Sequence, residues 1–330
     1  MNLILFLILS TIILFGCTSD TDFDNSDFTS EISTISGDTS NLTVPFVAVG
    51  GSINSSDFTV IQSNDALNWN LISLHNLNLT SAGGFRSITY GNEYVIVGNS
   101  GYYLTSNDSI NWEVSNYNSS LPQEKKSVTY GSNKYLATGT GGSQSTQILV
   151  ESNDGKTWSG SNFEKNNYSE SGLSIKYCLN KFFLITSDFY SSEDGSSWTK
   201  INTSNFSLGN YSKLFCVNGK IFVGGQNGKL AYSSDGLNFS VITGFNSTVH
   251  GITYGKNVYV LIDDGGIKYN STLLTNWSIS RDGVTMLYDI TYRNGFFIAV
   301  GGTGQIYTSD DGISFDNRIS PTGESLYSVF

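Results

Sequence analysis

The heptapeptide Ser106-Asn-Asp-Ser-Ile-Asn-Trp112 is one copy of a pattern, Ser-x-Asp-x-x-x-aromatic, that returns along the 330-residue chain. Seven such boxes begin 38 to 46 residues apart, at Ser63, Ser106, Ser152, Ser192, Ser233, Ser271 and Ser309. A period near 40 residues is typical of β-propellers and solenoids, and it outweighs the two average domains that the length alone would suggest.

Upstream of each box the sequence predicts three short strands, and the box leads into a fourth. In the second repeat the three strands are residues 86–90, 94–98 and 102–105, with Gly91-Asn92 as the first hairpin turn. The fourth strand begins at Trp112. Four short strands in about 40 residues make one propeller blade.

The two ends of the chain supply one blade between them. Leu326-Tyr-Ser-Val-Phe330 matches the first strand Leu287-Tyr-Asp-Ile-Thr291, and Phe46-Val-Ala-Val-Gly50 matches the second strand Phe297-Ile-Ala-Val-Gly301. Pairing of these ends closes a ring without exposed edges, whereas a solenoid needs capping repeats. We therefore predict an all-β, seven-bladed β-propeller over residues 46–330, closed by the C-terminal strand.

The charge of the chain argues against one class of partner. It has 17 Lys and Arg against 28 Asp and Glu, a net charge of −11. Nucleic-acid binding requires clustered basic side chains, and the adjacent pair Lys125-Lys126 is interpreted as part of a solvated loop. We expect no nucleic-acid partner.

Residues 1–16 are predicted to be an export signal. The apolar run 3–15 is too short for a membrane span, which needs about 20 residues. Leu14-Phe15-Gly16-Cys17 resembles the bacterial lipobox, which implies cleavage before Cys17, a lipid on Cys17 and a membrane of the bacterial cell envelope as partner. The alternative is an ordinary signal peptide with an incidental Cys. Residues 17–45, acidic and rich in Ser and Thr, are predicted to be a flexible tether.

The boxes resemble the Asp-box, or BNR repeat, of sialidase-like propellers. In such a turn the carboxylate accepts backbone N–H groups, and the aromatic residue fills the gap between sheets. Identical residues around a ring do not converge, so we expect a structural role and no metal. The box residues are Asp65, Asp108, Asp154, Asp194, Asp235, Asp311, Trp69, Trp112, Trp158, Trp198 and Trp277. Box six has Leu273 and Leu274 in place of Asp and Gly, and its turn is predicted to be the loosest.

No set of reactive residues converges in the sequence. A sialidase requires three arginines on the substrate carboxylate, but the four arginines here lack the Arg-Ile-Pro motif of that family. His75 and His250 are the only histidines, and no nucleotide-binding fingerprint occurs. We expect no cofactor and favour binding over catalysis.

The candidate binding face is the one opposite the boxes, which carries the strand two-to-three turns and the inter-blade loops. The repeat is irregular on this face, where it contains the long loop 139–147 and the adjacent carboxylates Asp263-Asp264. The alternative interpretation of Asp263-Asp264 is a solvated turn. Exposed aromatic and amide side chains suit a protein or a glycan as partner. The candidates are Arg86, Tyr117, Tyr190, Gln226, Asp263, Asp264, Arg281 and Tyr288. The predicted function is a monomeric, non-catalytic binding scaffold; a polysaccharide hydrolase or lyase and an envelope-complex assembly factor are the alternatives.

Cys178 and Cys216 follow the first strands of blades four and five, where another blade has Gly91. Equivalent positions of adjacent blades are neighbours near the axis, and an exported protein meets an oxidising compartment. The sequence leaves open whether they form a disulfide or remain two small buried thiols.

Overall fold

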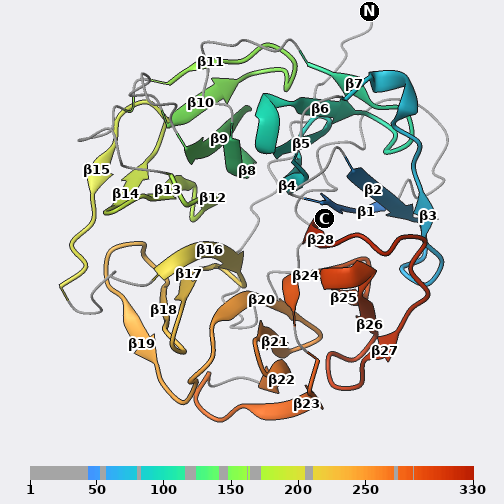
Figure 1. Ribbon diagram of the computed structural model, residues 1–330. Coiled ribbons are helices and arrows are strands. Elements are labelled where there is room, and N and C mark those ends of the chain that lie inside the picture. The colour runs from blue at the N-terminus through green and yellow to red at the C-terminus, as the bar shows by residue number, and fades with distance from the viewer. Residues whose placement is uncertain are drawn as a thin grey trace, which may run out of the picture. The chain divides into compact units, whose positions relative to one another are not determined.

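The computed structural model describes residues 44–52, 57–79, 83–115, 124–140, 148–161, 163, 172–204, 211–270, 274–284 and 286–330. These residues form seven antiparallel sheets of four strands each, arranged around a common axis (Figure 1). The predicted all-β, seven-bladed propeller is confirmed. Within the described ranges, no helix has the length and apolar character needed to span a membrane.

Each blade places its strands in order from the axis outward. Blade 1 holds β28 (Leu326–Val329), β1 (Phe46–Gly51), β2 (Phe58–Ser63) and β3 (Asn70–Leu71). Blade 2 holds β4 (Phe85–Tyr90), β5 (Tyr94–Gly98), β6 (Tyr103–Ser106) and β7 (Glu113–Val114). Blade 3 holds β8 (Glu124–Gly131), β9 (Lys134–Thr140), β10 (Leu149–Ser152) and β11 (Ser159–Gly160). Blade 4 holds β12 (Ser174–Cys178), β13 (Lys181–Ile185), β14 (Phe189–Ser192) and β15 (Thr199–Lys200).

The remaining blades repeat this order. Blade 5 holds β16 (Tyr211–Val217), β17 (Lys220–Gly225), β18 (Leu230–Ser233) and β19 (Ser240–Ile242). Blade 6 holds β20 (Val249–Gly255), β21 (Val258–Asp263), β22 (Gly266–Asn270) and β23 (Ser278–Asp282). Blade 7 holds β24 (Leu287–Arg293), β25 (Phe296–Gly301), β26 (Ile306–Ser309) and β27 (Asp316–Asn317). Short 3-10 turns, η2 (His75–Leu77), η3 (Asn99–Gly101) and η4 (Gly302–Gly304), lie in the connections.

The ring closes where β28 pairs with β1. The innermost strands contact one another in the order β28, β4, β8, β12, β16, β20, β24 and back to β28. Val47 and Phe330 exchange two backbone hydrogen bonds of 3.0 and 2.9 Å, and Gly50 lies opposite Leu326. Arg293 of the last blade donates to the carbonyl oxygen of Pro45 across this seam. The closure predicted from the two chain ends is therefore present.

The core lies between the blades. Each sheet is covered on both faces by its neighbours, so the middle positions of the second strands are mainly apolar rather than alternating, and β5 is buried at every position. The hydrophobic clusters among the described residues each join two adjacent blades; Phe183 of blade 4, for example, packs with Val223 of blade 5. Burial of this kind stabilises a blade only when both neighbours are present.

A Tyr-on-Gly contact recurs between the ends of neighbouring innermost strands. The rings of Tyr130, Tyr177 and Tyr292 lie against Gly91, Gly131 and Gly255 of the preceding blades, so closely that a Cβ added to Gly131 would be 2.1 Å from the ring of Tyr177. Glycine is required at these positions because the ring occupies the space of a side chain.

Candidate functional site

The Ser-x-Asp boxes form self-contained turns. Oδ1 of Asp65 accepts the backbone N–H groups of Leu67 and Asn68 at 2.9 and 2.8 Å and the hydroxyl of Ser63 at 3.0 Å. The same pattern of bonds is formed by Asp108, Asp154, Asp194, Asp235 and Asp311. Each carboxylate is thus occupied by its own turn.

The box aromatic residue fastens its blade to the preceding one. The indole N–H of Trp158 donates to the carbonyl of Gly155 at 2.9 Å, and its ring stacks on Tyr103 of blade 2 with centroids 4.5 Å apart. Trp69, Trp112 and Trp198 make the same indole bond at 3.0 to 3.1 Å. In box six the bond from Trp277 to Leu274 is 3.4 Å; residues 271–273 lie outside the described ranges.

We expect the box turns to weaken the protein in acid. The N–H groups of Thr157 and Ser197 hold the pKa values of Asp154 and Asp194 at about 2, below the ordinary 3.8. A pKa lowered by folding gives stability that is present above the ordinary value and is lost as pH falls toward the folded one. The urea midpoint should therefore fall between pH 4 and pH 2. Asp154→Asn, which keeps the acceptor and cannot titrate, should show a shallower fall; an identical slope would contradict this explanation.

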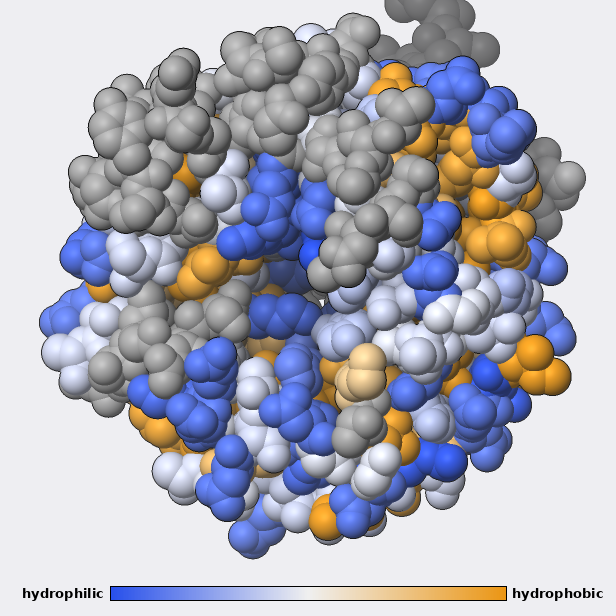
Figure 2. Space-filling view, in the orientation of Figure 1, coloured by the Kyte–Doolittle hydropathy of each residue, from blue (hydrophilic) through white to orange (hydrophobic). Residues whose placement is uncertain are grey.

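The face opposite the boxes, called the loop face below, carries the turns between second and third strands and the inter-blade connections. Figure 2 views this face and shows a hollow at its centre, bordered by hydrophilic side chains. The innermost strands begin there, so their first residues surround the axis. This is where side chains from different blades come together.

A continuous row of side chains, the axial rim, joins four blades at this opening. It consists of Arg86, Tyr327, Tyr288, His250 and Asp264. The guanidinium carbon of Arg86 lies 4.4 Å from the ring centroid of Tyr327, which stacks on Tyr288 at 5.2 Å. His250 meets Tyr288 edge-on at 6.4 Å, and its Nε2 lies 2.6 Å from Oδ1 of Asp264. Three predicted residues, Arg86, Tyr288 and Asp264, therefore belong to one structure.

The electrostatics of the rim follow from these contacts. Burial raises the pKa of Tyr288, so its hydroxyl stays protonated. Burial would also raise the pKa of Asp264, but hydrogen bonds from His250 and Thr248 outweigh it and hold that pKa below its ordinary value. Asp264 is therefore ionised, and its partner is His250 rather than a second carboxylate.

Deeper on the axis lies a charged group, the axial cluster, formed by Lys176, Lys213 and Asp289. Nζ of Lys213 donates to the carbonyl oxygens of His250 and Tyr288 at 2.9 and 2.6 Å. Lys176 of blade 4 and Lys213 of blade 5 both interact electrostatically with Asp289 of blade 7, across the ring. Burial lowers the pKa of both lysines, and Asp289 opposes that shift.

Sequence analysis missed both lysines, although a signal was available. Lys213 occupies the position of Ser87 and Ser127, and Lys176 that of Thr129, in otherwise Ser- and Thr-bearing innermost strands. The hydroxyls at these positions bond the next blade, as when Ser87 accepts the N–H of Val128 at 3.2 Å. A lysine in place of the hydroxyl residue of an innermost strand therefore indicates a side chain near the axis.

The structure corrects the placement of three predicted residues. Tyr190 is 9 % exposed and packs edge-on against Phe163 between blades 3 and 4, because its strand β14 is covered on both faces. Arg281 lies on the outer strand β23, where its guanidinium covers the ring of Tyr307 at 4.8 Å. Asp263 is 1 % exposed, and its Oδ1 accepts Nζ of Lys268 at 2.5 Å, so it is neither a solvated turn nor free for a ligand.

The other predicted positions divide between surface, interior and undescribed parts of the chain. Gln226 is exposed in the β17–β18 turn, on the loop face. Lys125 was expected in a solvated loop but lies fully buried in β8, where burial lowers its pKa to about 7. Cys17, Tyr117 and residues 141–147 of the long loop lie outside the described ranges.

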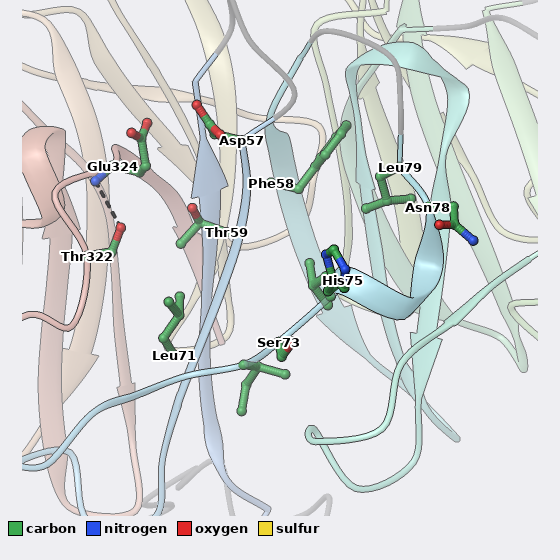
Figure 3. Close-up of a pocket in the computed structure, with 12 residues that line it drawn as sticks. Asp57, Phe58, Thr59, Leu71, Ser73, His75, Asn78, Leu79, Thr322 and Glu324 are labelled. Carbon is green, nitrogen blue, oxygen red and sulfur yellow. Dashed lines mark hydrogen bonds between the residues drawn. The ribbon is translucent and has the colours of Figure 1, made fainter.

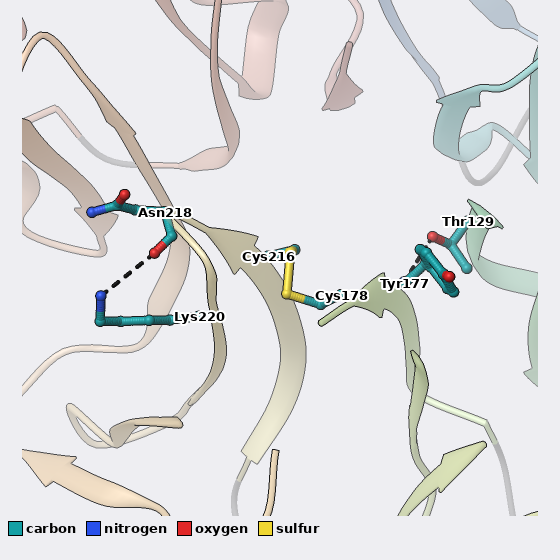
Figure 4. The surroundings of a disulfide bond; sticks show 6 residues. All are labelled: Thr129, Tyr177, Cys178, Cys216, Asn218 and Lys220. Carbon is teal, nitrogen blue, oxygen red and sulfur yellow. Dashed lines mark hydrogen bonds between the residues drawn. A yellow bond between two sulfur atoms is a disulfide. The ribbon is translucent and has the colours of Figure 1, made fainter. Parts of the chain in front are cut away.

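Cys178 and Cys216 form a disulfide between blades 4 and 5, with Cα atoms 5.4 Å apart (Figure 4). Their positions are not equivalent, in contrast to the expectation. Cys178 occupies the glycine position of its hairpin, because it pairs with Lys181 as Gly131 pairs with Lys134. Cys216 occupies the tyrosine position, one residue earlier, because it pairs with Ile221 as Tyr177 pairs with Phe182. The bond therefore replaces a Tyr-on-Gly contact by a covalent one.

A separate pocket lies away from the axis, over blade 1. Its volume is about 680 Å³, and it is open to solvent (Figure 3). The walls come from the start of β2, the connection through η2 and the segment before β28, and include Phe58, His75, Leu79 and Glu324. None of the predicted site residues lines it. Over the described ranges, no three His, Cys, Asp or Glu side chains gather as metal ligands would.

Comparison with known proteins found solved structures of the same fold and a family model that matches part of the sequence. No curated protein matches the chain. Among solved structures, one described as YCF48 bound to D1 peptide is 17 % identical, with a TM-score of 0.55 over 71 % of this chain and 81 % of that one. YCF48 from Cyanidioschyzon merolae is also 17 % identical, with a TM-score of 0.57 over 74 % and 88 %.

A virginiamycin B lyase from Staphylococcus aureus, in a catalytically inactive form with quinupristin, gives a TM-score of 0.60 at 11 % identity, over 76 % of this chain and 90 % of that one. At such identities the likeness shows the fold alone. A family model described as the DUF6242 beta propeller domain matches residues 106–235. The chain is thus a seven-bladed β-propeller that is similar, from the second to the fifth Ser-x-Asp box, to the DUF6242 beta propeller domain.

Proposed function

We propose that the protein is a non-catalytic binding module that recognises a protein or a glycan through its loop face. The observation that carries this proposal is the axial rim, where side chains of four blades meet at one opening. The box carboxylates are occupied by their own turns. Side chains that converge from different elements are typical of binding sites on rigid scaffolds.

The arrangement of the loop-face carboxylates favours binding over hydrolysis. Glycoside hydrolases require two carboxyl groups that flank the bond to be cleaved. Here Asp263 is buried in an ion pair with Lys268, and Asp264 is bonded to His250. YCF48, which has the same fold, has been solved bound to D1 peptide. This supports a peptide or protein as one class of ligand for the present chain.

The test is capture of a partner by the full-length protein from an envelope fraction. The face variant carries Arg86→Ala, Gln226→Ala and Asp264→Ala. The matched control carries Lys156→Ala, Glu193→Ala and Leu237→Ala, all in box turns on the opposite face. We expect the face variant to capture at least tenfold less of any specific partner and the control to be unaffected, because a few central residues dominate an interface. Capture by the face variant equal to that by the wild type, or equal loss in the face variant and the control, would refute the proposal.

We also propose that the mature chain is anchored in a membrane of the bacterial envelope through a lipid on Cys17. The sequence Leu14-Phe15-Gly16-Cys17 and the acidic stretch after it support this. A single acyl chain binds a membrane weakly, and stable anchoring requires two. Cys17→Ala should abolish labelling with a radioactive fatty acid and release the protein from the membrane fraction. Unchanged labelling and fractionation of Cys17→Ala would contradict the anchor.

A further inference from the structure

Basic side chains gather around the axis of a protein that is otherwise acidic. The chain carries 17 basic residues and a net charge of −11. Four of these basic residues stand on the innermost strands of consecutive blades: Arg86 on β4, Lys126 on β8, Lys176 on β12 and Lys213 on β16. All four keep part of their surface accessible to solvent. Acidic groups also lie here, with Asp264 at the rim, Asp289 farther along the axis and Glu124 on β8, so the four basic groups exceed the acidic ones by one. An excess of positive charge in a low-dielectric opening concentrates anions.

Of the two lysines in the axial cluster, Lys176 is the less compensated, because Lys213 donates to two carbonyl oxygens. The interaction of Lys176 with Asp289 crosses the axis, and among the described residues its ammonium group has no hydrogen-bond acceptor. A charge held among protein atoms without a partner costs free energy of folding. A serine or threonine would serve the blade contact at this position, as Thr129 does when it accepts the N–H of Tyr177 at 3.0 Å. The lysine therefore calls for a function other than stability.

The charges of the axial cluster leave one positive charge in excess. Lys213 and Lys176 contribute two, and Asp289 contributes one negative charge. The carboxylate of Asp289 is already occupied, because its Oδ2 accepts the hydroxyl of Ser328 at 2.9 Å and the N–H of Val329 at 3.0 Å. A ligand with a single negative charge would balance the cluster, whereas a dianion would leave one negative charge without a partner in a partly buried site.

Arg86 is oriented to receive such a ligand at the opening. Tyr327 holds the guanidinium plane from one side, and Nε lies 3.4 Å from Oδ1 of Asn99. Across the described part of the chain, its two Nη atoms have no acceptor. A guanidinium fixed by an aromatic ring offers parallel N–H groups that match the two oxygens of a carboxylate.

We propose that the axial opening binds a small monocarboxylate, with Arg86 holding the carboxylate at the rim and the axial lysines supplying the field that draws it in. This deepens the proposed function, on which it rests, by naming a ligand class. A sugar acid and a simple hydroxy acid share this chemistry, and they are compared separately in the test. The neutral side chains of the rim, Tyr288 and Tyr327, leave room for an uncharged remainder of the ligand at the surface.

The test is isothermal titration of the purified full-length protein with galacturonate, lactate, galactose and inorganic phosphate. We expect saturable binding with one site for galacturonate or lactate, none for the neutral sugar galactose, and at least tenfold weaker binding of phosphate. Lys176→Met should weaken carboxylate binding at least about tenfold, the effect of losing one charged partner, and should leave the protein folded because it removes an uncompensated charge. Arg86→Lys keeps the positive charge but removes the parallel N–H donors of the guanidinium, so it should also weaken carboxylate binding.

The control is Lys181→Met, which removes a lysine that pairs with Glu193 on the box face of blade 4 and should leave carboxylate binding unchanged. Equal weakening by Lys181→Met, equal binding of galactose, or no saturable binding of either acid would overturn the proposal. Binding of an acidic peptide without binding of either small acid would also overturn it. Partner capture by Lys176→Met separates the two ideas: a partner still captured by a protein that binds no carboxylate leaves the proposed function standing.

Discussion

Gly50→Ala should lower the free energy of unfolding by at least about 3 kcal/mol, the upper range for forcing an atom into a filled space. Gly50 lies in β1 opposite Leu326, and a Cβ on it would stand 1.8 Å from the carbonyl oxygen of Ser325. That atom belongs to the backbone that leads into β28, so relief requires the closing strand to move. Chemical denaturation followed by tryptophan fluorescence measures the loss.

Two matched variants locate the effect at the seam. Gly139→Ala makes the same kind of clash, 1.9 Å from the carbonyl oxygen of Glu124, inside the continuous blade 3. Gly323→Ala meets nothing within 4 Å and should change stability by less than about 1 kcal/mol. Gly50→Ala alone should make residues 326–330 accessible to carboxypeptidase, because there the clash separates β28 from its sheet. Resistance equal to that of Gly139→Ala would show that the seam is not the weak point.

Cys216→Ser should cost about 3 to 4 kcal/mol, the chain-entropy value for a cross-link between residues 38 positions apart. A second loss adds to this, because the disulfide stands where other blades place a tyrosine ring on a glycine. The variant should unfold at a lower urea concentration, and the wild type should do the same after reduction. A wild type whose midpoint is insensitive to reductant would contradict the disulfide.

The register of the hairpins offers a sharper variant for the same interface. Cys178→Gly combined with Cys216→Tyr restores the pair found between blades 2 and 3 and between blades 3 and 4. We expect the double variant to recover part of the stability lost in Cys216→Ser, since ring packing replaces the covalent link. Cys216→Tyr alone should recover nothing, because Cys178 would still occupy the space of the ring.

The fold was predictable because the repeat specifies local and long-range structure together. Each box fixes a turn by its own hydrogen bonds, and each apolar second strand requires a sheet on both sides. The division of blade 1 between the two chain ends was predictable because Phe46-Val-Ala-Val-Gly50 matches the second strand of another blade and Leu326-Tyr-Ser-Val-Phe330 matches the first strand. No single strand carried this information; the period did.

The site was only partly predictable, because side-chain direction depends on register. The loop face was located from the position of the boxes. Arg86, Tyr288 and Asp264 proved to belong to one row, in which Tyr327 and His250 stand between them. Tyr190 was misplaced because both faces of β14 are covered, which the local sequence does not reveal. The cysteines were aligned one residue apart from their true register, and a shift of one residue reverses the side of the strand on which a side chain stands.

The seam between β1 and β28 also sets the order in which the molecule can be completed. Blades 2 to 7 are each made of one continuous segment and can form as their residues emerge. Blade 1 must wait for residues 326–330, so until then β1 presents a free strand edge and blade 7 lacks a neighbour. Joining segments about 280 residues apart carries a high entropic cost and slows folding. An incomplete ring is thus the stage of folding at which we expect the chain to be most prone to aggregation.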